Sequence, residues 1–164
     1  MFVYPEYKKI LFCVDFSESS ERTFAYACAI AKRDKGKIYL MHVMPIMPNK
    51  GFIENLIPQD VLDTAYKNNM EALEKEFQEK FISKCKRDVE FEVVIREGRE
   101  YQEIIKFALE EKVDLIVLGT HGWTGIGHVL LGSVADKVVR NSPVPVFIVP
   151  SMKKYEEGRA TNHG

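Results

Sequence analysis

Short apolar runs that alternate with longer amphipathic stretches constrain this chain more than any other feature of its sequence. The run LIVLG at 115–119 has no polar face, which is typical of a strand buried on both sides of a parallel sheet. Strands that alternate with helices imply crossover connections and helices on both faces of the sheet. We therefore predict an α/β fold, and 164 residues suffice for one domain with its own core.

The expected elements follow from the spacing of apolar residues and from the residues that start or end each element. Strands are expected over 8–15, 37–43, 89–95, 115–119 and 144–149. Helices are expected from a cap at Ser17 or Ser19 to Gly36, from Gln59 onward, over 101–109 and over 133–140. Residues 44–58 contain three prolines and Gly51, so we expect a long loop there. One face of strand 89–95 is more polar than the other, which places this strand at or near a sheet edge.

Charge and composition exclude several classes of function. Lys and Arg total 23 against 24 Asp and Glu, a net charge of -1, which leaves no broad positive surface for nucleic acid. No segment has the roughly 20 apolar residues of a membrane span, and none resembles a signal peptide. Cys13, Cys28 and Cys85 form no C-x-x-C pair, which suggests reduced thiols. We expect a cytoplasmic protein with one domain over 1–151 and a polar, disordered tail over 152–164.

A glycine-rich segment after the fourth strand carries the most specific chemical signal. Residues 119–133 contain G-x-x-G, then nine residues, then G-S. Glycine lets backbone N–H groups approach an anion, and Ser133 begins a helix whose amino terminus presents N–H donors and the positive end of its dipole. The segment contains no Lys or Arg, so a phosphate there would be held by the main chain. The alternative is a merely flexible loop.

Asp15 and Val43 follow the first two strands, at the edge of the sheet where ligands of parallel α/β sheets bind. A carboxylate suits a ribose because it can accept two hydrogen bonds from a diol. The alternative for Asp15 is that it caps the next helix or braces the turn. Val43 would contact a ligand only through its backbone.

Metal and dinucleotide sites are not expected. His42, His121 and His128 form neither an H-x-x-x-H pair nor a cluster with cysteine, and a structural zinc site needs four ligands. The chain has no G-x-x-x-x-G-K-[ST] motif and no G-x-G-x-x-G after the first strand. This excludes a P-loop ATPase and disfavours a dinucleotide site.

The glycine spacing resembles the phosphate-binding pattern of ATP-binding universal stress proteins. The similarity extends to the opening KKILFCVDFS, to His42 and Val43, and to the closing PVPVFIVP. It implies a three-layer, open, parallel five-stranded sheet of order 3-2-1-4-5 with helices on both faces, of the adenine nucleotide alpha hydrolase-like type. Two features depart from the family: Cys13-Val14 stands in place of a proline-threonine pair, and Glu100 stands in place of the proline of a G-x-P element.

The resemblance also implies an ATP site. Adenine would lie near Val43, ribose near Asp15, and phosphates on the 119–125 loop and at 132–134, with Mg²⁺ bound through the phosphates and water. The residues expected to bind nucleotide are Cys13, Val14, Asp15, Val43, Gly119, Thr120, His121, Gly122, Gly125, Gly132, Ser133 and Val134.

The function implied is that of an ATP-dependent switch or sensor in a stress response. Efficient hydrolysis needs cationic or metal stabilisation of the γ-phosphoryl group and a positioned water, and the loop supplies no cation, so we expect slow hydrolysis at most and no catalytic residue. Similar proteins pair their last strands, which implies a homodimer through 144–149. Two alternatives are a dimeric interaction module whose pocket binds no ATP, and an enzyme that transfers nucleotides.

Overall fold

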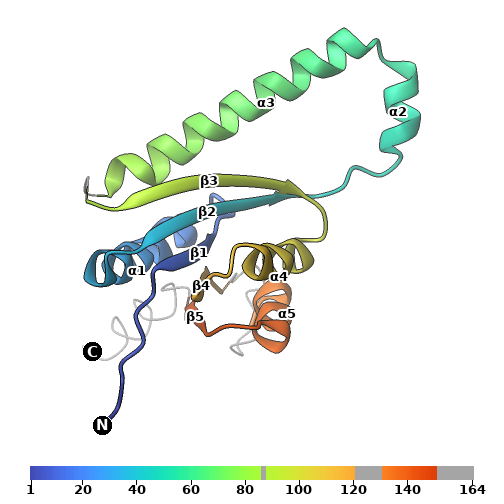
Figure 1. Ribbon diagram of the computed structural model, residues 1–164. Coiled ribbons are helices and arrows are strands. Elements are labelled where there is room, and N and C mark those ends of the chain that lie inside the picture. Colours follow the sequence, from blue (N-terminus) through green and yellow to red (C-terminus); the bar gives the residue numbers. More distant parts are fainter. Residues whose placement is uncertain (86–87, 121–130, 151–164) are drawn as a thin grey trace, which may run out of the picture.

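The computed structural model describes residues 1–85, 88–120 and 131–150 and shows a sheet with helices against both faces (Figure 1). In chain order the elements are β1 (Lys9–Cys13), α1 (Glu18–Asp34), β2 (Lys37–Met44), α2 (Lys50–Leu56), α3 (Gln59–Lys80), the 3-10 helix η1 (Ile82–Lys84), β3 (Glu90–Glu97), α4 (Glu100–Glu110), β4 (Leu115–Gly119), α5 (Ser133–Asn141) and β5 (Val146–Val149). The five strands are parallel, in the order β3-β2-β1-β4-β5. The predicted fold class, sheet order and edge position of the third strand are confirmed.

The sheet separates two hydrophobic clusters, because alternate residues of each central strand face opposite sides. Ile10 and Phe12 of β1 pack with α1 and the end of α3, whereas Leu11 packs with α4 and α5. All three side chains are fully buried. Burying one such side chain contributes roughly 1.5–3 kcal/mol, so β1 stabilises both layers of helices against the sheet.

Helix α1 begins and ends at residues that satisfy its terminal backbone groups. Of the two candidates, Ser17 and not Ser19 is the N-cap, because the Ser17 Oγ accepts a hydrogen bond from the Ser20 N–H at 3.1 Å. At the other end Lys35, not Gly36, takes the left-handed conformation, with φ 52°. A Cβ at Gly36 would lie 2.4 Å from the Tyr7 carbonyl oxygen. Gly36 is therefore needed for the close approach of two chain segments.

The prediction of one long loop over 44–58 is wrong. Met44 still belongs to β2, and residues 50–56 form α2. All three prolines of the segment lie outside this helix, so none removes one of its hydrogen bonds. No residue of α2 is buried, and Figure 1 shows α2 and the first part of α3 extending beyond the sheet.

The remaining elements lie within a few residues of the predicted ones. The last strand begins only at Val146, after Pro145, whose carbonyl accepts a hydrogen bond from the Ile116 N–H. Along the parts of the chain that the structure describes, no helix combines the length and the apolar character needed to cross a bilayer. The tail expected over 152–164 lies outside the described residues, and the single domain over 1–151 stays a prediction.

The close contact at Gly36 predicts a marked loss of stability when a side chain is added. Gly36→Ala forces the Tyr7 backbone to move, so we expect the free energy of unfolding to fall by about 1–3 kcal/mol in urea titrations. Gly51→Ala is the matched control, because nothing lies within 4 Å of a Cβ there and alanine favours a helix. If both variants are as stable as the parent chain, the close approach at Gly36 does not constrain the fold.

Candidate functional site

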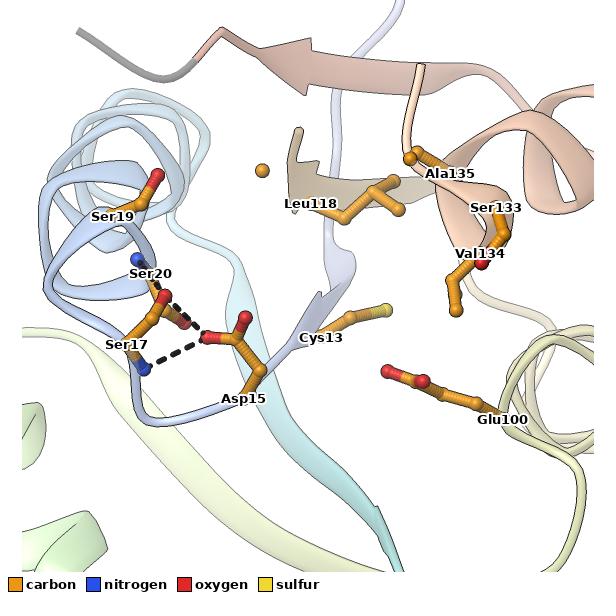
Figure 2. A pocket seen from close by; sticks show the side chains of 12 residues that line it. Cys13, Asp15, Ser17, Ser19, Ser20, Glu100, Leu118, Ser133, Val134 and Ala135 are labelled. Carbon is orange, nitrogen blue, oxygen red and sulfur yellow. Dashed lines mark hydrogen bonds between the residues drawn. The ribbon is translucent and has the colours of Figure 1, made fainter. Parts of the chain in front are cut away.

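A cavity of about 230 Å³ lies at the carboxyl ends of β1 and β4. The strand order reverses between these strands, since β1 is followed along the chain by β2 on one side and has β4 on the other. Such a reversal leaves a crevice, and ligands of open parallel sheets bind in it. The first turn of α1 and the amino termini of α4 and α5 complete the walls (Figure 2).

Asp15 is held at the cavity by its own turn. Its Oδ1 accepts hydrogen bonds from the Ser17 N–H at 2.9 Å and from the Ser17 hydroxyl at 2.7 Å (Figure 2). The bracing role that the sequence left open is therefore present. The same residue lines the cavity, so bracing the turn and facing a ligand are compatible.

Phe16, which lies between Asp15 and Ser17, has a strained backbone. Its φ of 60° is in the left-handed region, which costs a bulky residue of order 1–3 kcal/mol and is common at functional sites. Its ring packs on Phe77 at 5.0 Å and on His42 at 4.9 Å between centroids. Lys80 of α3 donates a hydrogen bond to the Phe16 carbonyl at 3.0 Å. The end of α3 therefore stabilises the turn that presents Asp15.

The amino terminus of α5 points at the cavity from the other side. Gly132 is its N-cap, and no side chain of a described residue caps the helix. Ser133, Val134 and Ala135, which follow, all line the cavity. The first N–H groups of a helix have no partner within it and lie at the positive end of its dipole, so this end suits an anion.

Glu100 gives the cavity a second carboxylate, beside the Cys13 thiol. Glu100 is the first residue of α4, and its carboxylate extends toward Cys13 and Val134 (Figure 2). Burial raises the pKa of the Cys13 thiol far above its ordinary value, and the negative charge of Glu100 raises it further. Cys13 is therefore a neutral thiol near pH 7. No Lys or Arg is among the described residues that line the cavity.

Half of the twelve residues predicted to bind nucleotide line this one cavity. They are Cys13, Asp15, Gly119, Gly132, Ser133 and Val134. Gly119 also packs closely against α1, because a Cβ there would lie 3.0 Å from the Thr23 Oγ1. That these six residues bind nucleotide stays a prediction.

Three other predicted residues do not line the cavity. Val14 is buried, and its N–H donates to the Met41 carbonyl. Val43 packs against the α4 and α5 side of the sheet, and the Thr120 N–H donates to the Val149 carbonyl at 3.0 Å. The last three predicted residues lie outside the described residues: His121, Gly122 and Gly125.

Six lining residues were not predicted as ligand contacts. They are Ser17, Ser19, Ser20, Glu100, Leu118 and Ala135. A usable signal was present for the serines, because three hydroxyls crowd into the first turn of the helix that follows Asp15. The departure from the family's G-x-P element singled out Glu100 in the sequence, but the direction of its side chain depends on how α4 packs on the sheet.

Comparison with known proteins gives the family. The model of the universal stress protein family matches residues 6–150. The chain belongs to the universal stress protein family. Universal stress protein MJ0531 of Methanocaldococcus jannaschii is 36% identical over 150 residues, which cover 90% of this chain and 85% of that protein.

Solved structures of the family share the fold. Hypothetical protein MJ0577 is 32% identical, with a TM-score of 0.65, over 90% of this chain and 98% of that one. UspA of Lactobacillus plantarum has a TM-score of 0.67 at 24% identity, over 89% of this chain and 99% of that one. A universal stress protein in complex with cAMP has a TM-score of 0.58 at 23% identity, over 89% and 98%. The last two identities are low enough that they bear on the fold alone.

The double role of Ser17 predicts a stability effect at the mouth of the cavity. Ser17→Ala removes the helix cap and one of the two hydrogen bonds to Asp15, so we expect a loss of about 1 kcal/mol in the free energy of unfolding. Ser19→Ala, two residues along the same wall, is the control and should cost less than about 0.5 kcal/mol. Equal effects in urea titrations would contradict the assignment of Ser17 as the cap.

Proposed function

We propose that this universal stress protein binds ATP in the cavity between β1 and β4 and acts as a nucleotide-dependent switch or sensor. The observation that carries the proposal is the amino terminus of α5, which faces the cavity with no capping side chain from a described residue. A phosphate there would accept hydrogen bonds from the N–H groups of Ser133 and Val134 and would meet the positive end of the dipole.

The donor set of the cavity fits a phosphorylated ligand. Four serines line it: Ser17, Ser19, Ser20 and Ser133. Ser20 is only 5% exposed, and its hydroxyl has no hydrogen-bond partner among the described residues. A buried hydroxyl without a partner loses the hydrogen bonds it would make to water, and a polar ligand would restore one.

Asp15 favours a sugar on the side of the cavity away from α5. Its carboxylate would accept hydrogen bonds from a ribose diol. The cavity of about 230 Å³ is smaller than the roughly 300–1,000 Å³ of ordinary ligand pockets, so a whole nucleotide would extend beyond it. Val43, on the same side of the sheet as Cys13, is one strand farther along, in the direction an adenine would take.

Binding without rapid turnover is the chemistry this cavity supports. Phosphoryl transfer is accelerated by cations placed at the γ-phosphoryl group, and the described lining has no Lys or Arg. Mg²⁺ would accompany ATP through phosphate oxygens and water, since no cluster of three or more His, Cys, Asp or Glu side chains suited to a metal occurs among the described residues. We expect at most slow hydrolysis.

A related structure holds a different adenine nucleotide. One universal stress protein was solved in complex with cAMP, a nucleotide that has no triphosphate. Thermal shift assays with ATP, ADP, AMP and cAMP, each with Mg²⁺, distinguish these ligands, because a ligand that binds only the folded chain raises its melting temperature. Mass spectrometry of small molecules released from the denatured protein identifies any nucleotide that it retains.

We also propose a homodimer through residues 144–149. Strand β5 is the edge of the sheet, and Phe147 in it is 39% exposed. An exposed apolar edge strand is prone to association, and pairing with a second copy would cover it. The rival function, an interaction module that binds no ATP, would share this dimer but show no nucleotide-dependent rise in melting temperature.

A substitution at Gly132 separates binding from folding. Its φ of -55° is open to any residue, and Asp is a favoured N-cap, so Gly132→Asp should keep the free energy of unfolding within about 1 kcal/mol. Its carboxylate would take the N–H groups meant for phosphate and repel the anion, so we expect ATP affinity to fall at least tenfold by calorimetry.

Gly132→Asn is the matched control, because it caps equally well without the charge and should lose less affinity. Unchanged affinity in a folded Gly132→Asp variant would exclude the amino terminus of α5 as the phosphate site. No binding of any nucleotide to the parent chain would instead favour the interaction module.

A further inference from the structure

Two of the three cysteines meet outside the cavity. Cys28 is on α1 and Cys85 directly follows η1, and both are partly buried thiols outside any disulfide. They pack against the same hydrophobic cluster, and the Cys85 side chain lies close enough to the Cys28 thiol to raise its pKa. Neither lines the cavity proposed to bind nucleotide.

Two ion pairs hold the segments that carry these thiols side by side. Lys84 Nζ lies 2.5 Å from Glu21 Oε2, and Lys32 Nζ lies 3.0 Å from Asp88 Oδ2. Glu21 is seven residues before Cys28 on α1 and Lys32 is four after it, so the three share one side of the helix. Cys28 therefore lies on α1 between two ion pairs that join these segments.

We propose that Cys28 and Cys85 form a redox-sensitive dithiol that closes to a disulfide when the protein meets a hydroperoxide. Cys85 loses its proton and attacks the peroxide, the O–O bond breaks, Cys85 becomes a sulfenic acid, and the hydroxide that leaves takes up that proton as water. The Cys28 sulfur then attacks the Cys85 sulfur and displaces the hydroxyl, which leaves as water with the Cys28 proton. Overall two thiols lose two protons and two electrons, and hydrogen peroxide becomes two waters.

The surroundings of the thiols set this order. Burial raises the pKa of the Cys28 thiol strongly, and the neighbouring Cys85 raises it further, so Cys28 keeps its proton until the second step. Cys13 packs into the cluster on the opposite side of the sheet. It is therefore an internal control that should neither join the bond nor be oxidised at the same rate.

The bond would tie the connection between α3 and β3 to α1. It closes a long loop from α1 through β2, α2 and α3, and cross-links across long loops restrict the unfolded chain most. The same end of α3 holds the Phe16 carbonyl through Lys80. The disulfide would therefore restrain the helix that stabilises the turn of Asp15.

The test uses the reduced full-length chain and hydrogen peroxide in small molar excess. After alkylation of the remaining thiols and digestion, mass spectrometry should find the Cys28 and Cys85 peptides joined within one chain, lighter by two hydrogens, and separable by a reductant. Cys13 should be recovered with an intact thiol. A dominant cross-link through Cys13, a bond between chains, or higher oxides at Cys85 with no cross-link would overturn the proposal.

Variants give an independent measurement. Oxidation should raise the melting temperature of the parent chain by roughly 5 °C or more, and of Cys13→Ser equally. Cys28→Ser and Cys85→Ser should show no rise. A rise that survives in Cys28→Ser would mean that another reaction is responsible. Both measurements are made without nucleotide, so the dithiol and the ATP site can fail separately.

Discussion

The burial of β1 on both faces is the constraint on which the rest of the structure depends. Its neighbours β2 and β4 pair with it in parallel, and the helices that follow each strand pack on opposite sides of it. Because the chain leaves β1 toward one neighbour and returns to the other, a crevice opens at its carboxyl end. The same burial that stabilises the fold thus determines where Cys13 and Asp15 are presented.

The turn after β1 places Asp15 at the cavity at a cost in stability. A left-handed Phe16 costs energy, yet the aromatic contacts with α3, the Lys80 hydrogen bond and the Asp15 contacts with Ser17 hold it. Helix α3 is therefore more than a cover for the sheet. Its carboxyl-terminal end acts on the mouth of the cavity, while its beginning and α2 extend away from the core (Figure 1).

The elements that a local pattern determines were predictable, and those that depend on packing were not. The run at 115–119 became β4 with the predicted bounds, because a strand buried on both faces has no polar side. The stripe from Gln59 became α3, although only Phe77 of that helix is buried. Helix α2 was missed because prolines around it suggested a loop, although none lies inside it. The backbone angle of Phe16 and the direction of Glu100 depend on distant partners, and no short window of sequence contains them.

Helix α1 connects the two chemistries proposed for this chain. Its first turn supplies Ser17, Ser19 and Ser20 to the cavity, and its middle carries Cys28 opposite Cys85. Lys80, which contacts the turn before α1, and Cys85, which lies near Cys28, belong to one continuous stretch, since η1 follows directly on α3. A covalent bond at Cys85 would act on the same α3 end that holds Phe16, whereas a ligand at Asp15 would act on it from the other side. Because the bond and the ligand would restrain one shared element, each would reduce the ordering that the other requires, which is a favourable coupling without any change of fold.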